Sequence, residues 1–233
     1  MSGPAYNTAL IVGAGSGLSA SLARLLAKAG LKIALAARSP DDLAELAGET
    51  GAKVFKCDAS KEEQVNRLFD DVEAALGVPD VAIYNASFRT RGAFVELVPA
   101  EVEKAIAVTA FGAFLVAQAA AKRMLPNRHG TIFFTGASAS VKGYAQSAPF
   151  AMAKFALRGL AQSLARELQP QGIHVAHFVI DGGIRSERRP VPADKPDSLL
   201  DPDAIAQTYL DVLRQPRSAW STEVELRPWV EKF

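Results

Sequence analysis

The sequence is poor in cysteine, in net charge and in long uninterrupted hydrophobic runs. Its 233 residues include one cysteine, Cys57, so no disulfide can form within the chain. The 26 lysines and arginines nearly balance 25 aspartates and glutamates, which argues against nucleic acid or an anionic membrane as partner. The longest apolar stretch, Ala105 to Ala121, is interrupted by polar residues and a glycine. A membrane span needs about 20 more uniformly apolar residues, so this stretch predicts a buried helix.

Histidine is also scarce, and the three histidines do not suggest a metal site. His174 and His177 are three apart in an apolar run that predicts a strand, so their side chains should point to opposite faces. Neither these two nor His129 has a cluster of cysteines or carboxylates around it in the sequence. We therefore expect no metal ligands.

The N-terminal segment lacks the pattern of a secretory signal. No basic region precedes the apolar run at Ala9 to Val12, and that run ends in glycines. A single cysteine also fits a reducing compartment. We therefore expect a cytoplasmic protein.

Short apolar runs alternate with segments of helical periodicity along the chain, and 49% of the residues are hydrophobic. The predicted strands are Thr8–Val12, Lys32–Ala36, Lys53–Lys56, Val81–Tyr84, Thr131–Phe134, His174–Ile180 and an edge strand within 219–226. The predicted helices are Leu18–Ala29, Pro40–Thr50, Lys61–Leu76, Pro99–Met124, Phe150–Gln169 and Pro202–Arg214. This alternation predicts one α/β domain over residues 1–233, with a Rossmann-type doubly wound parallel sheet in a three-layer α/β/α sandwich.

A glycine-rich turn follows the first predicted strand. It reads Gly13, Ala14, Gly15, Ser16, Gly17, and a predicted helix begins at Leu18. Glycines allow a sharp turn and a close approach of the backbone to a diphosphate, and the helix N-terminus offers free N–H groups. The pattern predicts a dinucleotide site at Gly13, Gly15, Ser16, Gly17 and Leu18, although ordinary turns also contain glycines.

The end of the second predicted strand indicates which dinucleotide binds. An NAD site usually has an acidic residue there for the ribose 2′-hydroxyl, but this chain has Arg38. A guanidinium can form charge-assisted bonds to a 2′-phosphate. We therefore expect NADP(H), with NAD(H) less favoured; the alternative is that Arg38 is a solvated surface residue.

With these motifs in order, the chain resembles the short-chain dehydrogenase/reductase family over nearly its whole length. The glycine-rich turn corresponds to the family's first motif, although Val12 and Ser19 replace its opening Thr and final Gly. The resemblance implies that Asp58 contacts the adenine, with Ala59 beside it, and that Asn85 and Ala86 pack on the ribose and phosphate side. It also implies that Gly182 and Ile184 lie at the nicotinamide, with Ser186 near the family's usual threonine.

The same resemblance indicates an altered active site. The family's Y-x-x-x-K motif corresponds to Phe150 and Lys154, one helical turn apart, so the lysine is kept and the phenol is lost. Ala137 stands at the family's serine position and Thr109 at its asparagine position. In the family, the phenol exchanges a proton with the substrate oxygen, which a phenyl ring cannot do. Lys154 remains a candidate for both catalysis and ribose binding.

Two neighbouring side chains are candidate replacements for the lost proton donor. Ser138 lies one residue after the family's serine position, and Tyr144 lies six residues before Phe150. Tyr144 can also simply line the substrate pocket, and this is the interpretation that we favour on sequence alone. A water held by Lys154 is the remaining alternative.

Two functions remain open on the sequence alone. One is an NADP(H)-dependent oxidoreductase that acts on a carbonyl or alcohol substrate. The other is a catalytically silent NADP(H)-binding sensor or partner subunit. In either case, the apolar helices Pro99–Met124 and Phe150–Gln169 and the family resemblance lead us to expect a homodimer or homotetramer.

Overall fold

A computed structural model describes residues 6–231, which form one parallel sheet in the order β3-β2-β1-β4-β5-β6-β7. The expectation about a signal peptide rests in part on residues 1–5, which lie outside the described residues. The strands are β1 (Thr8–Val12), β2 (Lys32–Ala37), β3 (Lys53–Lys56), β4 (Val81–Tyr84), β5 (Gly130–Thr135), β6 (Ile173–Ile180) and β7 (Glu223–Leu226). Several are buried on both faces, as apolar parallel strands should be.

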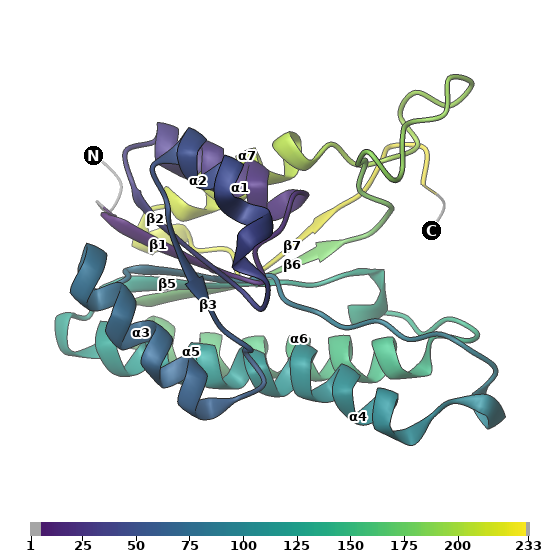
Figure 1. Cartoon of the computed structure of the whole chain (residues 1–233), viewed down its shortest axis with the longest axis horizontal. Coiled ribbons are helices and arrows are strands. Elements are labelled where there is room, and N and C mark those ends of the chain that lie inside the picture. The colour runs from purple at the N-terminus through teal and green to yellow at the C-terminus, as the bar shows by residue number, and fades with distance from the viewer. Residues whose placement is uncertain (1–5, 232–233) are drawn as a thin grey trace.

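Helices cover both faces of the sheet, which confirms the predicted three-layer α/β/α sandwich (Figure 1). On one face lie α1 (Leu18–Lys28), α2 (Ala44–Thr50) and α7 (Pro202–Leu213). On the other lie α3 (Glu62–Leu76), α4 (Pro99–Ile106), α5 (Gly112–Met124) and α6 (Ala148–Leu168). Each face has its own buried hydrophobic cluster, so the sheet is the shared centre of two cores.

Three predicted elements differ from those observed in more than a shift of one or two residues at their ends. The helix expected over Pro40–Thr50 begins as a 3₁₀ turn at Pro40–Leu43 before α2. The helix expected over Pro99–Met124 contains a π-helical turn, Ala107–Phe111, between α4 and α5. The edge strand expected within 219–226 is limited to β7, after a 3₁₀ turn at Arg217–Ala219.

The chain order reverses between β1 and β4, which lie side by side at the middle of the sheet. Loops from the carboxyl ends of these two strands diverge to opposite sides, and such a switch point opens a crevice for a ligand. Because β1 and β4 are parallel, the glycine-rich turn after β1 and the residues from Asn85 onward after β4 both begin at the same edge of the sheet.

One continuous helical stretch, Pro99–Asn127, is long and apolar enough to cross a membrane by length and composition alone. Half of its most apolar window is buried inside the protein. The core helix of a soluble protein passes the same test, which agrees with the buried helix expected from the sequence.

Candidate functional site

The glycine-rich turn leaves open space where a diphosphate would lie. A Cβ added at Gly15 or Gly17 would meet no atom within 4 Å, so the backbone of the turn is accessible to a ligand. Gly17 caps α1 without a side-chain hydrogen bond, which leaves amide groups of the first helical turn free. The geometry fits the predicted phosphate cradle.

Gly13 has a different reason to be glycine from the one that the sequence suggested. Its φ is +85°, and a Cβ there would lie 2.3 Å from the backbone nitrogen of Ala86. The bare backbone at Gly13 thus permits close contact with the turn after β4. Asn85 and Ser19 also join these turns, because Asn85 Nδ2 donates to Ser19 Oγ (2.7 Å) and Ser19 Oγ donates to the Gly13 carbonyl (3.1 Å).

A first cavity, of about 330 Å³, lies beside this turn toward the ends of β2 and β3. Six of the residues expected to contact the dinucleotide line it: Gly13, Arg38, Asp58, Ala59, Asn85 and Ala86. The structure thus brings together residues from four loops that the sequence placed far apart.

Charges in the first cavity are of both signs. Arg38 is exposed and forms no hydrogen bond or ion pair within residues 6–231. Asp58 Oδ1 accepts hydrogen bonds from the Ser60 amide (3.0 Å) and hydroxyl (2.7 Å). Although burial opposes it, these bonds and nearby Arg38 hold the pKa of the Asp58 carboxyl below its usual value. Asp42 also lines the cavity, and sequence reasoning missed it because it lies in the following 3₁₀ turn.

A second cavity, of about 560 Å³, continues from Asn85 across the ends of β5 and β6. Every residue expected at the reacting end lines it: Ser138, Tyr144, Lys154, Gly182, Ile184 and Ser186. Gly17 and Leu18 line it as well, so the glycine-rich turn and the proposed catalytic residues share one space. Ser16 lies in an adjoining cavity together with Gly17, Arg185 and Arg188.

Phe150 and Lys154 both face this second cavity from α6, as their spacing predicted. The Lys154 ammonium is buried, lies 5.7 Å from the Phe150 ring centroid and donates to the Thr135 carbonyl (2.7 Å). Burial lowers the pKa of Lys154 to about 8, so its ammonium and amine forms both occur near neutral pH. Lys154 can therefore orient a ligand or hold a water, whereas the Phe150 ring offers no proton.

Several hydroxyl side chains line the cavity, and three of them bear on the lost proton donor. Ser138 is half-buried in a 3₁₀ turn after β5, and Tyr144 is half-exposed. The third, Ser147, was missed by sequence reasoning. Its hydroxyl is buried and has no hydrogen-bond partner within residues 6–231. Buried hydroxyls are normally paired, so an orphan lining a cavity favours a bound ligand or water as its partner.

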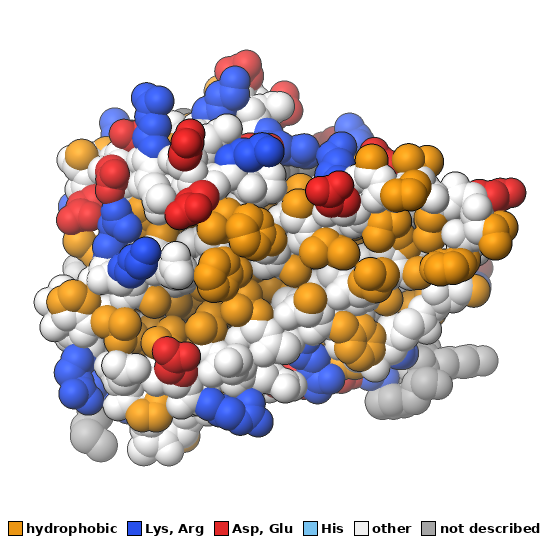
Figure 2. Space-filling view, turned by 90° about the horizontal axis from the view of Figure 1, so that it is seen from below, with side chains coloured by type: hydrophobic (Ala, Val, Ile, Leu, Met, Phe, Trp, Pro, Cys, Tyr) orange, Lys and Arg blue, Asp and Glu red, His pale blue; other side chains and the backbone are white. Residues whose placement is uncertain are grey.

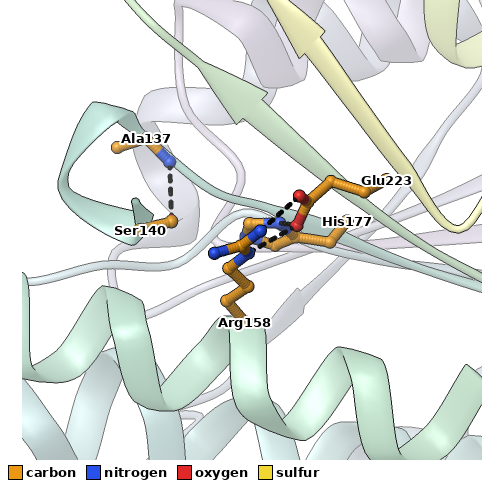
Figure 3. A network of polar contacts seen from close by, with 5 residues as sticks. All are labelled: Ala137, Ser140, Arg158, His177 and Glu223. Atoms are coloured by element: carbon orange, nitrogen blue, oxygen red, sulfur yellow. Dashed lines mark hydrogen bonds and ion pairs between the residues drawn. The ribbon is translucent and has the colours of Figure 1, made fainter. Parts of the chain in front are cut away.

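A polar network behind the cavity connects α6 to β6 and β7 (Figure 3). Arg158 binds both carboxylate oxygens of Glu223 at 2.7 Å, and His177 Nδ1 lies 3.2 Å from the same carboxylate. Burial lowers the pKa of His177 to about 4, so the imidazole is neutral at pH 7. The network holds the helix that carries Phe150 and Lys154 against the sheet.

Ser140, also drawn in Figure 3, closes the turn that carries Ser138. Its hydroxyl accepts a hydrogen bond from the Ala137 amide (3.1 Å). Ser140 itself does not line the cavity, but it stabilises the turn that does. Within residues 6–231, no group of three His, Cys, Asp or Glu side chains is placed to hold a metal ion.

Known proteins share both the sequence pattern and the architecture. The sequence family described as short chain dehydrogenase matches residues 7–190. An oxidoreductase of uncharacterized function from Staphylococcus aureus strain N315 is 28% identical over 226 residues, covering 94% of this chain and 96% of its own. Secoisolariciresinol dehydrogenase from Forsythia intermedia is 30% identical over 172 residues, which cover 72% of this chain and 62% of the plant protein.

Solved structures agree with these relatives. A short-chain dehydrogenase from Rhodopseudomonas palustris superposes with a TM-score of 0.84 at 32% identity, covering 97% of this chain and 100% of the other. A metagenomic short-chain oxidoreductase solved in complex with NADP gives a TM-score of 0.83 at 27% identity, covering 96% and 98%. The chain therefore belongs to the short-chain dehydrogenase/reductase family of oxidoreductases.

Proposed function

We propose that this protein is an NADP(H)-dependent oxidoreductase that acts on a carbonyl or alcohol substrate through an altered active site. The main support is a pair of cavities that share Asn85 and Ser87 in their linings beside the open glycine-rich turn, one reaching Arg38 and the other Lys154. The unpaired Arg38 favours a 2′-phosphate, and the related metagenomic oxidoreductase was solved with NADP. The Asp42 carboxylate would repel a 2′-phosphate, but Asp42 lies beyond Arg38, in the 3₁₀ turn Pro40–Leu43.

The residues around the second cavity have different roles in the reduction of a carbonyl substrate. When bound, the cofactor supplies a hydride to the carbonyl carbon, and the carbonyl oxygen takes up a proton to give an alcohol. Ser138, Tyr144 or a water held by Lys154 donates that proton, since Phe150 cannot. Ser147 offers one further hydroxyl at the same wall.

A catalytically silent NADP(H)-binding sensor or partner subunit is the second candidate. The support is that Phe150, Ala137 and Thr109 stand where the family has its tyrosine, serine and asparagine. Thr109 is buried, and its hydroxyl accepts from the Phe88 amide (3.2 Å), so its role there is structural. Loss of a general acid costs typically about 10²- to 10⁴-fold in rate, which slows a reaction without abolishing it. We therefore place the enzyme first.

Turnover distinguishes the two candidates. After NADPH binding is established, wild type and Phe150→Tyr are screened against a broad set of ketones and aldehydes by NADPH oxidation. An enzyme with only its proton donor altered should turn over slowly, and the variant should be faster by about 10²-fold or more. Tight NADPH binding with no oxidation by either protein would favour the silent candidate.

We also propose that the protein acts in the cytoplasm as a homodimer or homotetramer. Figure 2 shows hydrophobic side chains gathered on the face formed by α4, α5 and α6. Phe111, Phe114, Met152 and Phe155 are between 41% and 51% exposed, a large apolar surface for a single chain. This face lies on the side of the sheet away from α1 and α7, so pairing through it leaves the glycine-rich turn accessible.

A further inference from the structure

The second cavity has an unusual charge composition that the proposed redox chemistry does not require. Its lining includes Arg89, Lys154, Arg185, Arg188 and Arg189 and, among residues 6–231, no aspartate or glutamate. A wall of one sign concentrates ligands of the opposite sign and is costly to keep without them. The cavity is thus built to receive negative charge.

Some of these cations already have a partner or a place in cofactor binding. Arg185 forms an ion pair with Asp201 at 2.8 Å. Arg188 also lines the cavity that contains Ser16 and Gly17, so the cofactor's diphosphate would lie within its reach. Lys154 donates to the Thr135 carbonyl. None of these assignments accounts for Arg89 or Arg189.

Arg89 and Arg189 face the reacting end of the second cavity. The Arg89 guanidinium carbon lies 5.0 Å from the centroid of the Phe150 ring. An Arg189 nitrogen lies 2.8 Å from the Cβ position of Gly183, directly before Ile184. Backbone hydrogen bonds in both directions between Ser186 and Arg189, each 3.0 Å, hold this segment as a turn.

The two guanidiniums lie close enough to oppose each other's charge. Burial, Arg91 and Arg189 together lower the pKa of Arg89. Neither Arg89 nor Arg189 forms a side-chain hydrogen bond or ion pair with another residue in the described part of the chain. Two unneutralised guanidiniums that line the same cavity as the buried, unpaired Ser147 hydroxyl form a site for an anion with several acceptor oxygens.

We propose that Arg89 and Arg189 bind an anionic group of the substrate, which makes the substrate a carbonyl compound that also bears a carboxylate or a phosphate. This inference rests on the proposed function, because it takes the carbonyl end of the substrate to lie toward Lys154. Either group fits this site, since a guanidinium pairs with two oxygens of a carboxylate or of a phosphate in a fork.

The test is a calorimetric titration of the NADP⁺-saturated protein, because the oxidised cofactor cannot reduce the carbonyl ligands during the measurement. The ligands are α-keto acids from pyruvate to phenylpyruvate, each compared with its methyl ester, and glyceraldehyde phosphate compared with glyceraldehyde. We expect at least one acid to bind about 10- to 100-fold more tightly than its ester, because a hydrogen bond to a charged group contributes roughly 1.5–3 kcal/mol. Tighter binding of the phosphate pair alone would identify phosphate as the anion.

Substitutions of the two arginines test whether they cause the tighter binding of the charged ligand. Arg89→Met and Arg189→Met should each remove most of the preference, whereas Arg89→Lys should keep part of it. Arg67→Met, at an exposed arginine on α3, should leave it unchanged. Unaltered NADPH affinity in each variant shows that the fold is intact.

Failure of this inference is separable from failure of the proposed function. If NADPH binds and no charged ligand is preferred over its neutral partner, the anion site is wrong while the cofactor site stands. If NADPH does not bind, the proposed function fails, and the same titration of the free protein still decides whether Arg89 and Arg189 hold an anion.

Discussion

Single residues decide the chemistry of this site, and Lys154 is the most constrained of them. Its ammonium is buried, donates a hydrogen bond to the Thr135 carbonyl and lies beside the Phe150 ring. Burying a charge that has only a backbone carbonyl as partner is unfavourable. Retaining this lysine at a cost in stability is consistent with a role in ligand binding.

The buried lysine should make stability rise with pH. Its pKa falls from 10.5 when unfolded to about 8 when folded, so above pH 8 the unfolded chain binds a proton that the folded chain has lost. Between pH 7 and pH 9 the free energy of unfolding should therefore increase by roughly 1 kcal/mol. Urea unfolding at several pH values measures it.

Lys154→Met provides the control for this effect. The thiol of Cys57, whose pKa burial raises to about 11, acts in the opposite direction above pH 9 in both proteins. The difference between the two pH profiles therefore isolates the lysine. Identical profiles for wild type and variant would show that Lys154 is not the buried cation described here.

At the scale of elements, the turn after β1 depends on its contact with the turn after β4. Gly13 combines a φ of +85° with a Cβ position 2.3 Å from the Ala86 nitrogen. Gly13→Ala should destabilise the protein by roughly 2 kcal/mol or more and weaken NADPH binding, because the two turns must separate. Thermal unfolding and NADPH titration measure both effects.

Gly48 supplies a matched control for the substitution at Gly13. It lies inside α2, has no positive φ, and a Cβ there would meet nothing within 4 Å. Gly48→Ala should therefore stabilise the protein by about 0.5–1 kcal/mol. Equal effects of the two substitutions would contradict the contact between the turns.

The sequence predicted the regular elements well because their signals are local. Runs such as Thr8–Val12 and Val81–Tyr84 match the observed strands at both ends, since parallel strands buried on both faces are apolar throughout. The π-helical turn at Ala107–Phe111 was not predictable, because the surrounding residues continue a helical pattern. That turn brings the Val108 carbonyl to the hydroxyl of Tyr84, a tertiary contact.

The candidate site was predictable only at residues that belong to sequence motifs. The glycine-rich turn was found from its position between a strand and a helix, and Asp58, Asn85 and Lys154 from the family resemblance; all line the first or the second cavity. Arg89, Arg189 and Ser147 were missed, because they lie in irregular loops or at a helix N-terminus where spacing does not show which way a side chain faces.

At the scale of the whole molecule, the apolar face of α4, α5 and α6 predicts self-association (Figure 2). Light scattering at micromolar concentration should show a dimer or tetramer. Phe155→Glu, on this face, should shift the protein toward the monomer, whereas Lys28→Glu, on α1 across the sheet, should not. A wild-type monomer at this concentration would refute the proposed assembly.

The account as a whole depends on one claim, that the crevice at the middle of the sheet holds NADP(H). Isothermal titration calorimetry of wild type and Arg38→Gln with NADPH and NADH tests it most directly. We expect wild type to bind NADPH more tightly than NADH by about 10- to 100-fold, and Arg38→Gln to lose most of that difference while still binding NADH. No heat of binding with either nucleotide would contradict the account.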